Sequence, residues 1–150
     1  MKPLDLAGFL PYRISVLANR ISSRLANVYA DRFDLTIPEW RVMAVLGQFD
    51  GVSADFVCTK TEMDRVTVSR AVARLLRKRY ISRRFHVEDR RRSRLSLAAA
   101  GRQVYAEVVP LARRYEAALR QGIDTADLAR FDAVIGRLQE RIGELDASVL

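Results

Sequence analysis

The sequence predicts a mainly α-helical protein with one small β-hairpin. Apolar residues recur at steps of three and four over most of the 150 residues. Residues that cap helix N-termini precede several of these stretches, and strict alternation of apolar and polar residues occurs only near residues 81–97. This length suits one domain with an attached oligomerisation element, and it buries a core without disulfides or metals.

The first predicted helix runs from Pro11 to about Asp31, with the proline near its first turn. Its apolar residues fall on one face at helical spacing, and these are Ile14, Leu17, Ile21, Leu25 and Val28. A stripe of this length needs a partner surface.

A helix-turn-helix is predicted next. Thr36 and Glu39 have the spacing of a capping box, with Pro38 in the first turn of a helix that ends near Gly51. A short helix over 53–61 follows, and Asp64 is a good N-cap for a helix that runs to about Arg79.

The alternating segment predicts a hairpin with a charged tip, the wing of a winged helix-turn-helix. Ile81, Arg83 and Phe85 alternate with polar residues, as do Leu95 and Leu97. Between them lies the charged run 87–92.

Two further helices are predicted after the hairpin. One runs from Gly101 to about Gln121, and we expect Pro110 to kink it because proline lacks an N–H. Thr125 is the predicted N-cap of the last helix. The last helix has an apolar stripe made of Leu128, Phe131, Ile135, Leu138, Ile142 and Leu145. We therefore expect residues 1–34 and 99–150 to form a helical dimerisation base, and 35–98 the winged helix-turn-helix lobe.

The net charge of +8 comes entirely from the middle third of the chain. Residues 51–100 hold 13 lysines and arginines against 5 acids, whereas bases and acids cancel over the two flanks. A basic field this concentrated favours a polyanionic partner, with nucleic acid ahead of an anionic membrane.

The helix that begins at Asp64 divides into two faces. One face is apolar, with Val68, Ala71, Val72, Leu75 and Leu76. The other face and the first turn supply the candidate DNA contacts Arg65, Val66, Thr67, Ser69, Arg70 and Arg74. A basic face on an isolated helix is more often only a solvated surface, but the neighbouring wing favours DNA binding here.

The wing tip adds Asp89, Arg90, Arg91 and Arg92 as candidates. Arginines at a hairpin tip can enter a minor groove, whereas the alternative is a soluble turn with a surface ion pair.

Other chemistries have little support in the sequence. The single cysteine, Cys58, is interpreted as a small buried apolar residue, and the single histidine, His86, as a solvated strand residue. No catalytic constellation, metal cluster, cofactor motif, signal peptide or membrane-spanning run is recognisable, so we expect a cytoplasmic protein that is not an enzyme.

Four segments together resemble the MarR family of regulators: Leu35 to Trp40, Met63 to Arg70, Asp89 to Arg91, and Leu97 to Gly101. The resemblance implies a dimer that binds a pseudo-palindromic operator in double-stranded DNA, and often a repressor released by a small ligand. It also implies that the helix from Asp64 is the recognition helix, that Arg91 enters the minor groove, and that Asp89 holds Arg91 in place.

The sequence departs from the family pattern at two places. Arg79 stands where the family usually has a glycine, and Ala98-Ala99 replace Thr-Glu before Gly101. We expect the first change to remove a favoured left-handed C-cap and the second an N-cap.

Tyr12 and Trp40 are candidates for an effector pocket, although aromatic residues on an apolar helix face belong to a core more often. The alternative function is that of an architectural protein that binds duplex DNA with little sequence preference.

Overall fold

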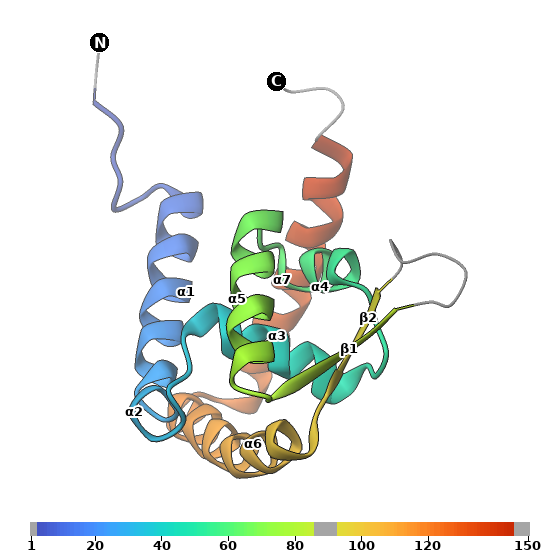
Figure 1. Ribbon diagram of the computed structural model, residues 1–150. Coiled ribbons are helices and arrows are strands. Elements are labelled where there is room, and N and C mark those ends of the chain that lie inside the picture. The colour runs from blue at the N-terminus through green and yellow to red at the C-terminus, as the bar shows by residue number, and fades with distance from the viewer. Residues whose placement is uncertain (1–2, 86–92, 146–150) are drawn as a thin grey trace. The chain divides into compact units, whose positions relative to one another are not determined.

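The computed structural model describes residues 3–85 and 93–145 and has the predicted mainly helical architecture with one hairpin (Figure 1). The chain forms two compact units that divide between Tyr115 and Glu116. The elements, in chain order, are α1 (Leu10–Ala26), α2 (Ala30–Phe33), α3 (Ile37–Gln48), α4 (Ala54–Thr61), α5 (Arg65–Arg77), β1 (Ile81–Phe85), β2 (Ser93–Leu97), α6 (Ala99–Arg120) and α7 (Thr125–Leu145).

The first predicted helix is wrong in its extent, because α1 ends at Ala26 and the short α2 follows after a turn. Asn27 and Val28 are weak helix formers at the break. The amides of Val28 and Tyr29 donate to the carbonyls three residues earlier, which tightens the last turn. This turn buries Tyr29 against Trp40, with ring centroids 5.5 Å apart.

The capping box of α3 is confirmed. The Glu39 amide donates to Thr36 Oγ1, and Glu39 Oε2 accepts from the Thr36 amide at 2.8 Å. The helix ends at Gln48 rather than near Gly51. The chain leaves the helix early because Val52 pairs with Leu95 through two backbone hydrogen bonds of 3.2 and 2.7 Å.

Strands β1 and β2 pair antiparallel in the register Ile81↔Leu97, Arg83↔Leu95 and Phe85↔Ser93. Ile81, Leu95 and Leu97 are buried in the core formed with α3, α4 and α5. The alternation in the sequence thus correctly assigned one face of the hairpin to the core.

Gly101 is required where α6 begins. A Cβ at this position would lie 1.8 Å from the Tyr80 carbonyl oxygen, so only glycine allows the first turn of α6 to approach the end of α5 so closely. The Tyr80 carbonyl also accepts from the Ala98 amide at 2.9 Å.

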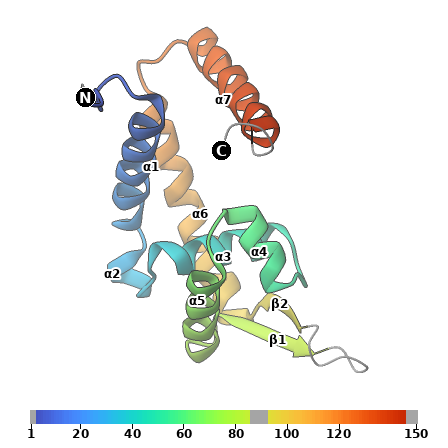
Figure 2. The same ribbon diagram turned by 90° about the horizontal axis from the view of Figure 1, so that it is seen from above.

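The terminal helices have no buried residue. In the first unit α1 and α6 lie side by side (Figure 2). The Tyr115 hydroxyl donates to the Ile21 carbonyl at 3.3 Å. The predicted cap of α7 by Thr125 is wrong. Asp124 caps this helix, because its Oδ1 accepts from the Ala126 amide at 2.7 Å.

Over the described ranges, no helix is long and apolar enough to cross a membrane.

Candidate nucleic-acid interface

The N-terminus of α5 is fixed by Asp64. Its carboxylate accepts from the Thr67 amide at 2.8 Å and from the Thr67 hydroxyl at 2.6 Å. These two donors, the hydroxyl first, lower the pKa of Asp64 below its usual value. The candidate Thr67 therefore uses its hydroxyl hydrogen in the cap and offers only oxygen lone pairs to a further partner.

The two faces of α5 differ as expected. Val68, Ala71, Val72 and Leu75 are buried, whereas Leu76 is half-buried. On the outer side Ser69, Arg70 and Arg74 are exposed, and Val66 is 57% exposed although it is apolar. An α-helix with its side chains is about 10–12 Å across, so α5 fits the major groove of B-DNA, which is about 12 Å wide.

Three of the candidates lie together. Thr67, Arg70 and Arg74 line a hollow of about 320 Å³, and Thr36 and Pro38 at the start of α3 form its other wall. The hollow brings donors of α5 and the start of α3 to one surface.

Arg65 lies at the edge of this surface and pairs with Asp55 of α4 at 3.5 Å. Both side chains are mostly exposed, so the pair contributes little to stability. The guanidinium remains available to a phosphate at small cost.

The other end of α5 is held by Lys78, which sequence reasoning missed. Its Nζ lies 3.1 Å from Glu39 Oε1, and Glu39 is fully buried at the start of α3. Lys78 also pairs with Asp34. The amphipathic pattern does not predict this ion pair, because Lys78 cannot be distinguished in the sequence from the many arginines of the basic surface.

Arg79 adopts a left-handed conformation with φ of 58°. The Arg79 amide donates to the Leu76 carbonyl and the Tyr80 amide to the Leu75 carbonyl, which together form a Schellman motif. The expected loss of the left-handed C-cap is therefore wrong, because Arg79 itself adopts the conformation that the family's glycine favours.

The hairpin carries arginines on both faces. Arg83 shares the face of Ile81, which packs on the lobe, whereas Arg84 lies on the opposite face. The wing-tip candidates Asp89, Arg90, Arg91 and Arg92, together with His86, lie outside the described residues.

The order of these elements is that of a winged helix-turn-helix, and residues 33–92 match the model of the MarR family. The lobe of this chain thus matches the MarR family. The match runs from the end of α2 to residue 92, just before β2, so it includes every candidate contact on α5. MarR-family proteins are transcriptional regulators that bind DNA.

Solved structures of MarR-family proteins resemble nearly the whole chain. A MarR/EmrR family transcriptional regulator from Acinetobacter sp. ADP1 has a TM-score of 0.85 at 23% identity, covering 94% of this chain and 99% of its own. BpsR from Bordetella bronchiseptica, whose DNA binding is regulated by 6-hydroxynicotinic acid, has a TM-score of 0.79 at 20% identity, covering 92% and 98%. PcaV from Streptomyces coelicolor, in complex with its natural ligand, has a TM-score of 0.74 at 23% identity, covering 93% and 98%.

These likenesses show that the terminal helices belong to the shared fold as well as the lobe. Among curated proteins none matches the sequence.

The MarR fold here separates the two candidates for an effector pocket. Trp40 is buried and packs between Tyr29 and Tyr105, at centroid distances of 5.5 and 6.0 Å. Tyr12 is exposed in the first turn of α1, roughly 20 Å along the helix from its end near Tyr29. Within one copy of the regulator they do not line one pocket.

Cys58 packs against the core on α4 but is half-buried, so it is less buried than the sequence predicted. Its position between the buried Val57 and the exposed Thr59 explains the intermediate exposure.

Proposed function

We propose that this MarR-family regulator is a homodimeric repressor that binds a pseudo-palindromic operator in double-stranded DNA. In this proposal α5 enters the major groove, and Arg91 of the wing enters the adjacent minor groove, oriented by Asp89. The observation that carries it is the outer face of α5, which presents exposed Arg70 and Arg74 beside an exposed Val66. Arginine suits guanine edges, and valine suits the thymine methyl.

The dimer in this proposal uses residues 1–34 and 99–150. Its support is the unburied apolar surface of α1 and α7. Two-fold symmetry of the protein would match the two half-sites of the operator.

A small ligand is proposed to release the DNA. BpsR and PcaV, which share the fold, have small-molecule ligands by their descriptions. Tyr12 and Trp40 remain the predicted ligand contacts. Because they are far apart within one protomer, each would contact ligand in a different part of the dimer.

The test compares sequence preference with overall affinity. DNA fragments selected by the purified protein give the operator, and wild type and variants are then titrated on the operator and on a scrambled duplex at two salt concentrations. Arg70→Ala should cost about 1–3 kcal/mol on the operator and flatten the preference at particular base pairs. Arg91→Ala should weaken binding to both duplexes and reduce the salt dependence.

Arg113→Ala is the matched control, because it removes the same charge from an exposed site on α6. Discrimination of about a thousandfold or more between operator and scrambled duplex supports a regulator. Little discrimination by wild type would instead support the architectural alternative.

A further inference from the structure

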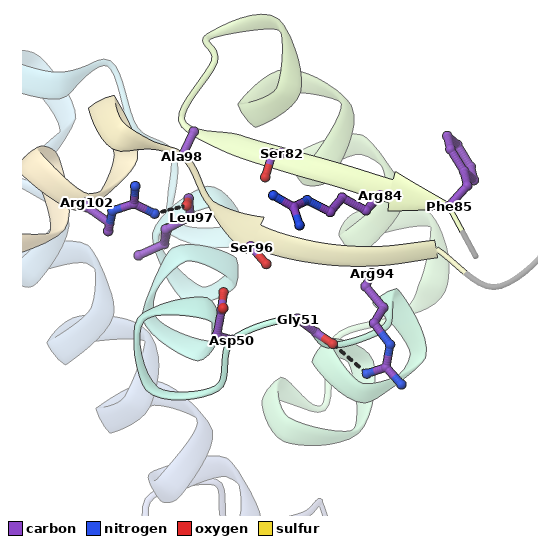
Figure 3. A pocket seen from close by; sticks show the side chains of 10 residues that line it. All are labelled: Asp50, Gly51, Ser82, Arg84, Phe85, Arg94, Ser96, Leu97, Ala98 and Arg102. Carbon is purple, nitrogen blue, oxygen red and sulfur yellow. Dashed lines mark hydrogen bonds between the residues drawn. The ribbon is translucent and has the colours of Figure 1, made fainter. Parts of the chain in front are cut away.

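A cavity of about 460 Å³ lies against the root of the wing, away from the candidate contacts of α5 (Figure 3). Its walls come from β1 and β2, from the turn after α3 and from the start of α6. The volume is in the range of small-molecule sites. The residues that the argument uses are Asp50, Ser82, Arg84, Arg94, Ser96 and Arg102.

The register of the hairpin shows which way this cavity opens. Ser82 pairs with Ser96 and Arg84 with Arg94, so these four side chains share one face. Ile81 and its neighbours on the opposite face are buried in the lobe. The cavity therefore lies on the face of the hairpin turned away from the core, whereas Arg83 shares the core-side face.

The charge of the cavity is unbalanced. Arg84 and Arg94 stand directly opposite each other across the two strands, and like charges at such positions are destabilising. Arg102 of α6 adds a third positive charge, and among the described residues of the lining only Asp50 carries a carboxylate. None of the three arginines forms an ion pair with an acid in the part of the chain that the structure describes.

Two of these guanidinium groups are held in place by backbone carbonyls. Arg94 Nη1 donates to the Gly51 carbonyl at 2.7 Å, and Arg102 Nη1 donates to the Leu97 carbonyl at 2.6 Å (Figure 3). Each arginine has five N–H donors, so most remain available. The side chain of Arg84 runs back along the hairpin toward Ser82 and Ser96, whose hydroxyls are further donors (Figure 3).

We propose that this cavity binds a small organic oxyanion, a carboxylate or a phosphate, and that its occupation weakens DNA binding. Guanidinium groups bind both oxyanions through charge-assisted hydrogen bonds, often bidentate. A bound anion would cancel part of the positive potential at the root of the wing, which attracts the duplex. This second part rests on the proposed function, whereas the binding site does not.

The first test titrates inorganic phosphate into the DNA-free protein by calorimetry, against chloride at the same ionic strength. Arg84→Gln and Arg83→Gln form a matched pair, because they remove the same charge from adjacent residues on opposite faces of β1. We expect Arg84→Gln to weaken phosphate binding roughly tenfold, as for a lost charge-assisted hydrogen bond. Arg83→Gln should leave it unchanged.

Asp50→Asn is a control that distinguishes loss of the phosphate site from misfolding. It removes the negative charge that the described part of the lining carries, so we expect phosphate to bind more tightly, and a damaged fold would not produce that gain. Equal effects of Arg84→Gln and Arg83→Gln, or no phosphate binding by wild type above the chloride control, would overturn the site.

The second test measures duplex affinity with and without phosphate at constant ionic strength. Phosphate should weaken DNA binding by wild type and much less by Arg84→Gln. If Arg84→Gln weakens duplex binding in the absence of phosphate as much as Arg83→Gln does, the cavity contacts a phosphodiester of the DNA, and the free-ligand proposal is wrong. If no duplex binds specifically, the proposed function fails, while the phosphate titration still decides whether the site exists.

Discussion

The lobe and the terminal helices have similar apolar patterns but different burial. In the lobe, α3 buries six residues and α5 buries four. In α1 and α7 no residue is buried, although each has an apolar face at helical spacing. The exposed residues include Leu17 at 50% and Ile142 at 61%.

The difference shows what an amphipathic pattern specifies. It determines which face of a helix prefers an apolar environment, but not which surface covers that face. In α3 and α5 the same chain provides the cover. In α1 and α7 one copy leaves large apolar side chains in water, which supports the proposed homodimer.

The largest expected effect comes from a charge in the exposed stripe of α7. Ile142→Glu should weaken the dimer roughly a hundredfold or more, because a buried carboxylate without a partner is costly. In one copy Ile142 is mostly exposed, so the substitution should leave the folded protomer intact. Sedimentation velocity over a concentration series measures the association, and circular dichroism checks the fold.

Ala133→Glu is the matched control for that variant. Ala133 is exposed and lies on the side of α7 opposite the stripe, so the same charge there should leave association unchanged. An Ile142→Glu protein that remains dimeric at wild-type affinity would show that the stripe of α7 is not the interface.

Within the lobe, the largest expected effect comes from Lys78. Lys78→Ala leaves the fully buried carboxylate of Glu39 without its cation, which should lower the free energy of unfolding by about 3 kcal/mol. Chemical denaturation followed by circular dichroism measures the change. Arg77→Ala, at an exposed neighbouring position, should change stability by less than about 0.5 kcal/mol.

The double variant Glu39→Gln with Lys78→Met separates the lost ion pair from lost packing. It removes both charges, so it should recover part of the stability that Lys78→Ala loses. Equal stability of wild type and Lys78→Ala would mean that the contact between α3 and α5 does not depend on this pair.

The sequence predicted the lobe well because residues at the start of each helix or strand determine where that element begins. Asp64 caps α5, Thr36 and Glu39 cap α3, and the alternation around Leu95 identifies the wing. The hydrogen bonds of the two caps join residues close in sequence, and the buried face of the hairpin follows from strict alternation. Both features can therefore be predicted from the sequence alone.

Apart from the cap of α7, which lies one residue from its predicted place, the main misses arose where distant residues decide the structure. The break after Ala26 depends on Tyr29 reaching Trp40, and the anchor of α5 depends on Lys78 reaching Glu39. The arginine-lined cavity likewise needs the strand register and the start of α6 before Arg84 and Arg102 come together. The spacing of apolar and polar residues along the chain does not show which distant residues come into contact.

Tyr29 lies between the two regions and provides a pH test of their contact. Burial raises its pKa to about 12 from 10.0, although the nearby charge of Arg41 opposes the shift. The neutral phenol therefore stabilises the fold fully below pH 10, and this contribution is lost as the pH rises toward 12. Tyr29→Phe keeps the ring but cannot ionise, so its free energy of unfolding should fall less than that of wild type between pH 10 and 12. Parallel curves for the two proteins would mean that Tyr29 is accessible to water and that the junction of α1 with the lobe is loose.

The smallest expected effect is a gain in stability at Arg79, within the lobe itself. Its left-handed φ of 58° is costly for a residue with a Cβ, whereas glycine adopts it freely. Glycine also gains freedom in the unfolded chain, which offsets part of the benefit. We therefore expect Arg79→Gly to be more stable than Arg79→Ala by about 0.5–1 kcal/mol, measured by urea denaturation. The comparison with alanine is needed because both variants lose the same guanidinium, so that only the backbone preference differs between them. Within a helix the order of alanine and glycine is the reverse, so an Arg79→Ala protein as stable as Arg79→Gly would show that α5 does not end in the Schellman motif.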